Sequence, residues 1–169
     1  FKISKTNKSF LILNRYLIMT KIVLNDEELP KYWYNIIPDL PKPLPKPKEP
    51  EDGPSRMKFL EQVMIKECLN QEFSLDRWIP IPKELIELYL HVGRPRPLYR
   101  AKRLEQRLGL SKVKIFYKRE DLSPPGSHKL NTALAQAYYA AKEGKEKLVT
   151  ETGAGQWGTA LAYATRLLG

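Results

Sequence analysis

Two short apolar runs, each followed by a polar loop and a stretch with helical periodicity, restrict the fold more than any other feature of this 169-residue chain. The first run covers residues 113–118, and apolar residues recur at helical spacing after residue 129. The second run covers residues 147–151, and residues 159–168 are again helical in pattern. Such runs predict strands of a buried parallel sheet, joined by a right-handed helical crossover. We therefore predict an α/β fold, with an incomplete parallel sheet and flanking helices.

Two strands of a buried parallel sheet do not form a stable structure by themselves. They need further strands beside them, and the sequence supplies only one more helix after the second run. We therefore expect this chain to be the amino-terminal portion of a longer protein.

Lys129 is predicted in the first turn of the first of these helices. The positive end of a helix dipole disfavours a second positive charge, so an ammonium there should lose its proton more readily than a free lysine does. An uncharged amine is what Schiff-base chemistry requires. The alternative is an ordinary surface lysine, one of 29 Lys and Arg residues in the chain.

The second helix is preceded by a glycine-rich loop, Thr152-Gly153-Ala154-Gly155-Gln156-Trp157-Gly158. A strand, such a loop and a helix start form an anion site, because free backbone N–H groups and the helix dipole point the same way. The G-x-G-x-x-G match within it is weak evidence for a dinucleotide, and a Walker loop is excluded because no Gly-Lys-Ser/Thr follows. Glu151 lies at the end of the predicted strand, where open α/β sheets bind their ligands. It is either a general acid or base or a solvated carboxylate.

The composition favours no other class of function. The net charge of +10 suggests an anionic partner, but the basic residues are scattered and often paired with acids, so nucleic-acid binding is the weaker, non-enzyme alternative. The single cysteine, Cys68, allows no intrachain disulfide and suits a reducing compartment. The two histidines have no companions at metal-ligand spacing, so no metal site is predicted.

The amino-terminal third divides into two parts. Residues 1–18 are predicted to be an upstream or disordered extension, since a natural start, Met19, follows them. Residues 19–56 form a proline-rich arm, which we expect to run extended along the surface and to be pinned by the aromatic side chains of residues 32–34. The remainder, residues 57–169, is predicted to be part of a catalytic domain.

Three further helices are predicted before the first apolar run. One covers residues 55–72, a second covers residues 82–90 and begins with a proline, and a third covers residues 100–108 and is closed by Gly109. Residues 93–97 are expected to make a rigid turn between the second and the third.

Several motifs of this sequence, in this order, resemble those of the tryptophan synthase beta chain, a pyridoxal-phosphate enzyme of fold type II. They are Gly93-Arg94-Pro95-Arg96-Pro97-Leu98, Lys118-Arg119-Glu120-Asp121-Leu122, Gly126-Ser127-His128-Lys129-Leu130-Asn131 and Glu151-Thr152-Gly153-Ala154-Gly155-Gln156. The proline-bearing arm and Trp157, where histidine is commoner in the family, are similar to the second, longer type of beta chain. Arg96 departs from the threonine that is usual at its place, which leaves its role open.

The resemblance implies the roles of the site residues. Lys129 would hold pyridoxal phosphate and serve as a base, while Glu151 would move a proton at the substrate hydroxyl. His128 and Asn131 would contact the cofactor. The substrate carboxylate would lie on the loop residues Thr152, Gly153, Ala154, Gly155, Gln156 and Trp157.

The resemblance also implies a cytoplasmic lyase that makes L-tryptophan from L-serine and indole, with no role for a membrane or nucleic acid. A homodimer and a tryptophan synthase alpha chain are the protein partners it suggests. Threonine synthase and serine dehydratase share the lysine-on-helix design and remain alternatives. Because the family's later phosphate loop lies outside these 169 residues, we expect the chain alone to be inactive.

Overall fold

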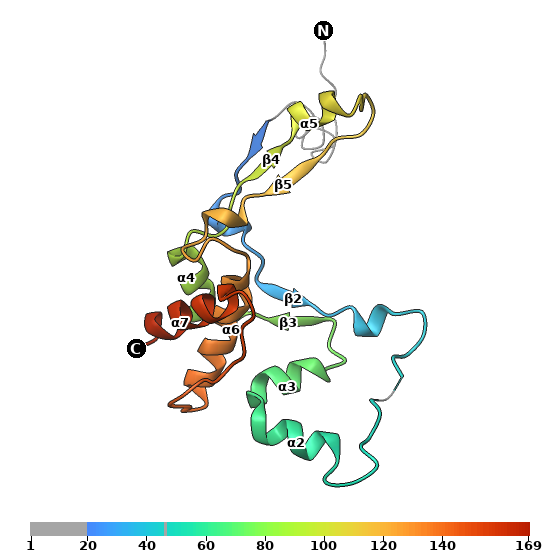
Figure 1. Ribbon diagram of the computed structural model, residues 1–169, viewed down its shortest axis with the longest axis vertical. Helices are drawn as coiled ribbons and strands as arrows, with labels where there is room; N and C mark the ends of the chain where they lie inside the picture. The colour runs from blue at the N-terminus through green and yellow to red at the C-terminus, as the bar shows by residue number, and fades with distance from the viewer. Residues whose placement is uncertain (1–19, 46) are drawn as a thin grey trace, which may run out of the picture.

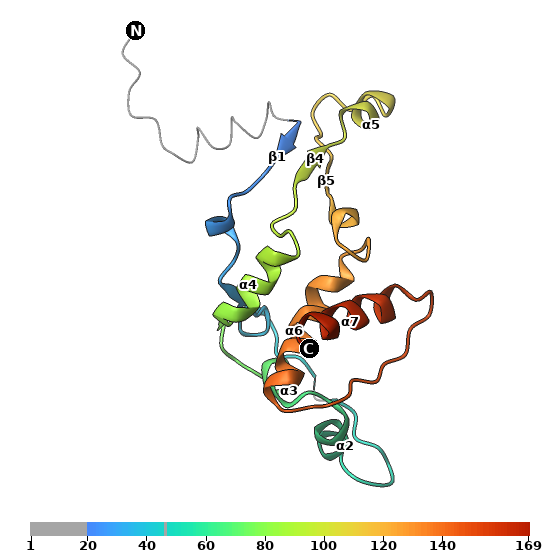
Figure 2. The same ribbon diagram turned by 90° about the vertical axis from the view of Figure 1, so that its left-hand side faces the viewer.

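The computed structural model describes residues 20–45 and 47–169 (Figure 1). Figures 1 and 2 show an elongated molecule with a small sheet at one end, a group of helices in the middle, and a helix pair at the other end. The extension predicted over residues 1–18 lies outside the described residues. Within the described part of the chain, no helix is both long and apolar enough to cross a membrane.

The middle of the molecule is built around helix α6, Lys129–Lys142. Helix α4, Lys83–His91, and helix α7, Gln156–Leu167, both pack against it. Small side chains at the α6–α7 contact allow the two helices to lie close together. The fully buried residues of this core include Leu85, Tyr89, Leu130, Ala133, Leu134, Ala160 and Ala164. The predicted helix after residue 129 is confirmed, and it begins at the expected lysine.

The end that is uppermost in Figure 1 is a three-stranded sheet in the order β1-β4-β5. Its strands are β1, Lys21–Ile22; β4, Leu98–Arg100; and β5, Phe116–Lys118. Both pairings are antiparallel, and Tyr99 stands opposite Lys21 on one side and Tyr117 on the other. Helix α5, Lys102–Arg107, follows β4. It starts two residues later than predicted because Arg100 belongs to the strand.

A second sheet joins the amino-terminal arm to the middle of the molecule. Strand β2, Tyr32–Tyr34, pairs antiparallel with β3, Trp78–Pro80. The ring of Trp33 meets the ring of Tyr89 edge-on, with 6.1 Å between the centroids. Trp33 therefore fixes the arm to the core, while Tyr32 and Tyr34 stay exposed. Short 3-10 turns, Asp26–Glu28, Ile37–Asp39 and Glu120–Leu122, complete the connections.

The single helix predicted over residues 55–72 is wrong, because the structure divides it in two. Helix α2, Arg56–Val63, ends at Met64, whose backbone is extended, and helix α3, Lys66–Glu72, starts after it. The Glu143 carboxylate, at the end of α6, accepts a 2.8 Å hydrogen bond from the backbone N–H of Glu67. An acceptor from a distant segment therefore caps the start of α3, which local periodicity does not reveal.

The mixture of helices and small sheets agrees with the predicted α/β class, but the two predicted parallel strands do not pair. Residues 116–118 pair antiparallel with β4, and residues 147–151 form neither helix nor strand. Val149, in the middle of the second run, is 95% exposed. The expected right-handed parallel crossover is therefore wrong for this structure. An apolar run indicates a strand, but it does not identify the strand's partner or its direction.

Candidate active site

The loop before α6 is closed by two serines. The Ser123 hydroxyl donates to the Ser127 carbonyl at 2.6 Å and accepts from the Ser127 N–H at 2.9 Å. Both residues are buried. Between them Gly126 has φ +73°, a conformation that side-chain-bearing residues rarely adopt, and its N–H donates to the Ser123 carbonyl at 2.7 Å. This short bonded loop fixes where α6 begins.

Lys129 is the first residue of α6 and is half-buried, with exposed His128 as the residue before the helix. Its backbone N–H lies 3.4 Å from the Ser127 hydroxyl oxygen. Asn131 begins the helical bonding by donating its N–H to the His128 carbonyl at 3.0 Å. The predicted position of Lys129 in a helical first turn is confirmed.

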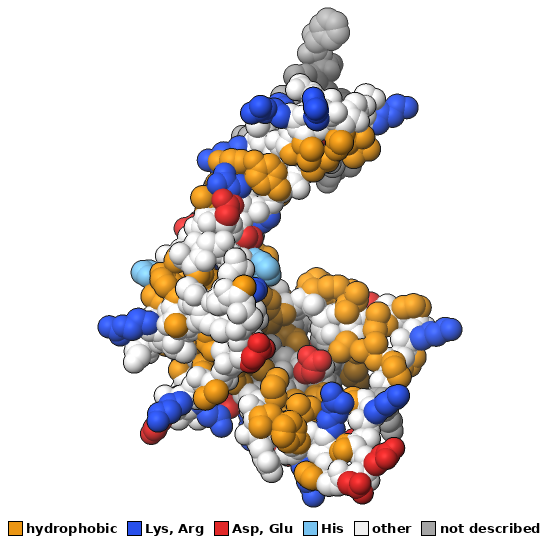
Figure 3. Space-filling view, viewed as in Figure 1, with side chains coloured by type: hydrophobic (Ala, Val, Ile, Leu, Met, Phe, Trp, Pro, Cys, Tyr) orange, Lys and Arg blue, Asp and Glu red, His pale blue; other side chains and the backbone are white. Residues whose placement is uncertain are grey.

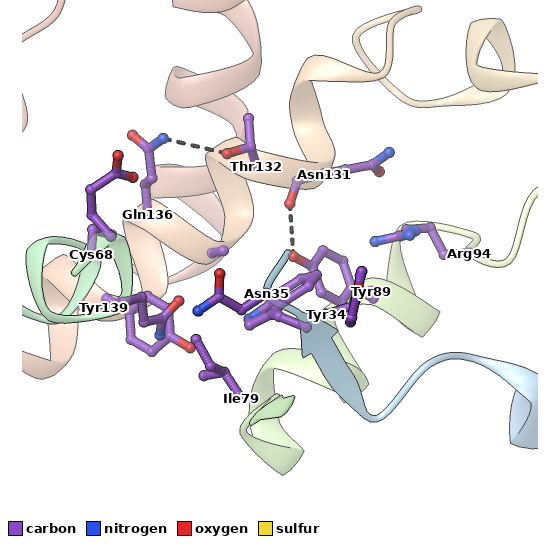
Figure 4. Close-up of a pocket in the computed structure, with 14 residues that line it drawn as sticks. Tyr34, Asn35, Cys68, Ile79, Tyr89, Arg94, Asn131, Thr132, Gln136 and Tyr139 are labelled. Atoms are coloured by element: carbon purple, nitrogen blue, oxygen red, sulfur yellow. Dashed lines mark hydrogen bonds between the residues drawn. The ribbon is translucent and has the colours of Figure 1, made fainter. Parts of the chain in front are cut away.

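Asn131, predicted from the resemblance to contact the cofactor, is engaged with protein groups in this structure. Its side-chain amide donates to Glu120 at 3.1 Å, and its amide oxygen lies 3.4 Å from Nη1 of Arg96. Its backbone carbonyl accepts a 2.7 Å hydrogen bond from the Tyr89 hydroxyl, drawn as a dashed line in Figure 4. These contacts hold the helix start to α4 and to the turn at residues 120–122. The cofactor contact itself stays a prediction.

Arg96, whose role the sequence left open, is the side chain that joins these groups. It is 2% exposed, although it carries a charge. Its guanidinium donates to the Val92 carbonyl at 2.9 Å and lies 3.4 Å from a Glu120 carboxylate oxygen. Burial lowers the pKa of the guanidinium, and Glu120 opposes that change. Sequence reasoning missed this cluster because Arg96 lies 24 residues from Glu120 and 35 from Asn131.

The glycine-rich loop folds over the start of α7. Gly155 precedes the helix with φ +88°. The Thr152 hydroxyl accepts a 3.2 Å hydrogen bond from the N–H of Gly158, and the Trp157 indole N–H donates to the Thr150 hydroxyl at 2.7 Å. Thr152, Gly153, Ala154 and Gln156 are exposed, so an anion can reach the N–H groups that the helix start leaves free.

Glu151 is exposed at the beginning of this loop. In the described part of the chain, no hydrogen bond or ion pair joins it to Lys129. The structure thus presents the two predicted catalytic residues at the approaches to the packed helices α6 and α7, without direct contact between them.

A pocket of about 490 Å³ lies beside α6 (Figure 4). Aromatic side chains of Trp33, Tyr89 and Tyr139 line it together with Asn131, and the guanidinium of Arg94 lies over the Tyr89 ring at 4.5 Å. Lys129 and Glu151 are not part of its wall. Figure 3 shows hydrophobic side chains on the molecular face that includes the α2–α3 end, where Phe59 and Val63 are exposed.

The arrangement fits a cofactor that condenses with an amine, together with a substrate that carries an anionic group. Half-buried Lys129 supplies an amine at the start of a helix whose preceding loop is fixed by hydrogen bonds, and the α7 start supplies backbone donors behind a left-handed glycine. Schiff-base chemistry needs the amine, and an anionic group needs the donors.

Comparison with known proteins agrees with this chemistry. Residues 89–169 match the family model described as pyridoxal-phosphate dependent enzyme. The chain is 58% identical over 151 residues to tryptophan synthase beta chain 2 of Methanothermobacter thermautotrophicus. The aligned residues make up 89% of this chain and 35% of that relative. It is 54% identical over 146 residues to tryptophan synthase beta chain 1 of Sulfurisphaera tokodaii, covering 86% of this chain and 34% of the relative.

A third relative, tryptophan synthase beta chain 2 of Thermococcus kodakarensis, is 55% identical over 150 residues. The chain spans about a third of the length of these curated relatives. The resemblance drawn from the motifs is therefore confirmed. By these matches residues 89–169 have the sequence pattern of the pyridoxal-phosphate dependent enzymes, and the chain is similar to the tryptophan synthase beta chains.

Proposed function

We propose that the protein containing this chain is a cytoplasmic lyase that joins L-serine and indole into L-tryptophan by a pyridoxal-phosphate-dependent replacement at the β carbon of serine. The observation that carries this proposal is the identity of 54% to 58% with proteins named tryptophan synthase beta chain. The structure of the site also supports the proposal, because half-buried Lys129 directly follows a loop that is fixed by hydrogen bonds.

The proposed catalytic and binding residues of this chain lie at the starts of two helices, α6 and α7. Lys129 would hold the cofactor through its amine, and as a free amine it would take the α proton of serine. Pyridoxal phosphate supplies an electron sink that makes the α proton removable. The positive end of the α6 dipole, where His128 lies beside Lys129, would favour a negatively charged group there.

At the other helix start, the loop at residues 152–157 binds the serine carboxylate through backbone N–H groups at the beginning of α7. The carboxyl group of Glu151 gives a proton to the departing serine hydroxyl and then orients indole for addition. Its exposure at the end of the apolar run gives a substrate access to it. A homodimer and a tryptophan synthase alpha chain are the protein partners that we propose.

The test uses the full-length protein that contains this chain, supplied with pyridoxal phosphate. We expect tryptophan to form from serine and indole, and we expect this to be lost in Lys129→Met and strongly reduced in Glu151→Gln. Borohydride reduction should attach the cofactor to the peptide that carries Lys129. Label on a different lysine would overturn the assignment.

The two enzyme alternatives predict different products. A serine dehydratase would release pyruvate from serine alone, without consuming indole, and a threonine synthase would leave both substrates unchanged. The α7 start with its left-handed Gly155 suits the carboxylate that all of these substrates carry, so product analysis has to discriminate between them.

A further inference from the structure

The buried guanidinium of Arg96 joins three segments that are far apart in the sequence. It donates to the Val92 carbonyl at the end of α4, and its Nη1 lies 3.4 Å from both the Glu120 carboxylate and the Asn131 amide oxygen. Glu120 also accepts from the Asn131 amide at 3.1 Å, so the three side chains close a ring of contacts. With the side chain of Arg96 only 1% exposed and that of Glu120 22% exposed, water screens their attraction little.

These contacts hold α6 on the face opposite the side chain of its first residue, Lys129. Asn131 is two positions after Lys129, which turns its side chain by about 200° around a helix of 3.6 residues per turn. Lys129 therefore leaves the helix on roughly the opposite face from the cluster of Arg96, Glu120 and Asn131. Arg96 can influence Lys129 only through the position of the helix turn they share.

A second set of contacts fixes the backbone around Arg96 itself. The Arg96 carbonyl accepts a hydrogen bond from the Lys118 ammonium, and the neighbouring Pro97 carbonyl accepts from the Arg119 N–H at 3.0 Å. The backbone at residues 96–97 is thus held against residues 118–119, which lead towards α6. An arginine on the protein surface would not be anchored in this way.

We propose that Arg96 is a positioning residue for Lys129, because its guanidinium, through Glu120 and Asn131, sets the first turn of α6. The role given to Lys129 rests on the proposed function, whereas the ordering of the helix start does not depend on it. A shorter side chain at this position could not reach Val92, Glu120 and Asn131 together, so these contacts depend on the arginine.

The experiment compares full-length wild-type protein with Arg96→Met, Arg96→Lys and Arg96→Met/Glu120→Gln. Amide hydrogen exchange is followed without cofactor in the peptide spanning residues 128–134, and borohydride labelling of Lys129 is followed at a fixed pyridoxal phosphate concentration. In Arg96→Met we expect exchange of this peptide to accelerate about tenfold, as loss of a hydrogen bond to a charged group implies. The concentration of cofactor that half-labels Lys129 should rise by a similar factor.

The other variants keep the test informative if Arg96→Met folds poorly. Arg96→Lys keeps the charge but not the forked donor geometry, so it should fold and give intermediate exchange and labelling. In the double variant the amide introduced by Glu120→Gln can both donate to Asn131 and accept from it, so both readouts should move back toward wild type.

Arg100→Met is the matched control, since Arg100 pairs with Glu105 in the β4–α5 region. It should alter exchange near residues 98–115 and leave Lys129 labelling unchanged. The proposal is overturned if Arg96→Met leaves the exchange of residues 128–134 unchanged, or if that exchange accelerates while labelling stays at the wild-type level. If wild-type protein is not labelled on Lys129, the proposed function fails, and the exchange data still decide whether Arg96 orders the helix start.

Discussion

The Tyr89 hydroxyl donates a 2.7 Å hydrogen bond to the Asn131 carbonyl and so joins α4 to the first turn of α6. Tyr89 is 1% exposed, and Phe at this position would keep the ring packing. We expect Tyr89→Phe to lower the free energy of unfolding by about 1 kcal/mol, since the hydrogen bond to the Asn131 carbonyl is lost. Urea unfolding of the full-length protein measures this. An unchanged unfolding midpoint would contradict a structural role for the bond.

The same residue makes a prediction about alkaline pH. Burial raises the pKa of Tyr89 above its ordinary value of 10.0. The folded state therefore keeps the phenolic proton that the unfolded chain loses, so the stability that it contributes is present below pH 10 and declines as pH rises above it. Tyr89→Phe should show a shallower loss of stability above pH 10 than the wild type. Parallel curves for the two proteins would be the contrary result.

The space beside Gly158 in α7 is limited by the Thr152 side chain of the glycine-rich loop. A Cβ added there would lie 2.9 Å from Cγ2 of Thr152, so Gly158→Ala should not gain the roughly 1 kcal/mol that alanine normally adds inside a helix. Thr152→Ser removes that methyl group and keeps the hydroxyl. The double variant Thr152→Ser/Gly158→Ala should therefore be more stable than Thr152→Ser by the amount that alanine normally adds. Gly153→Ala, which meets nothing within 4 Å, is the control for a loop glycine. Thermal unfolding of the four variants provides the comparison.

The ion pair of Arg100 and Glu105 predicts a dependence on acid. Glu105 is 4% exposed, and its carboxylate accepts from Arg100 and, at 2.8 Å, from the Ile115 N–H. The Arg100 guanidinium lowers the pKa of Glu105 below 4.5. The stabilisation is thus present above pH 4.5 and is lost as pH falls through the lower folded-state value.

We therefore expect Glu105→Gln to be less stable than the wild type at neutral pH and to lose less further stability between pH 5 and pH 3. Unfolding midpoints measured across that range test the prediction. Glu87→Gln, whose carboxylate is 64% exposed, should follow the wild-type curve. If Glu105→Gln also follows it, the pair has no effect on folding.

A substitution at Val149 tests whether residues 147–151 form the buried strand predicted from the sequence. Its side chain is 95% exposed, so Val149→Asp should change the free energy of unfolding by no more than about 0.5 kcal/mol. The adjacent Leu148 is partly buried against the core, and Leu148→Asp should destabilise the protein more than Val149→Asp because apolar contacts are replaced by a charge. A large loss in Val149→Asp measured on the full-length protein would instead favour the buried strand predicted from the sequence.

The sequence predicted the elements whose signals are local. The start of α6 was predicted at Lys129 and is confirmed, and the second helix, predicted from residue 159, begins three residues earlier at Gln156. The break at Met64 was missed because the cap of α3 comes from Glu143, 76 residues away from Glu67. No local pattern contains such a partner.

Strand pairing and buried polar contacts were unpredictable for a related reason. An apolar run indicates a strand but not its neighbour, so residues 116–118 were assigned to a parallel sheet although they pair with β4. Arg96 was visible only as a departure from a motif. Its burial depends on the meeting of Val92, Glu120 and Asn131, which only the folded chain brings about.

The short strand β1 gives the amino-terminal arm a protective role. Lys21–Ile22 covers one edge of β4, and β5 covers the other. A shortened protein that begins after Ile22 would leave the outer hydrogen-bonding groups of Leu98–Arg100 unpaired, and an uncovered strand edge invites pairing with another molecule. Trimming this arm should therefore turn a well-behaved protein into one that self-associates, with the new contact made along β4.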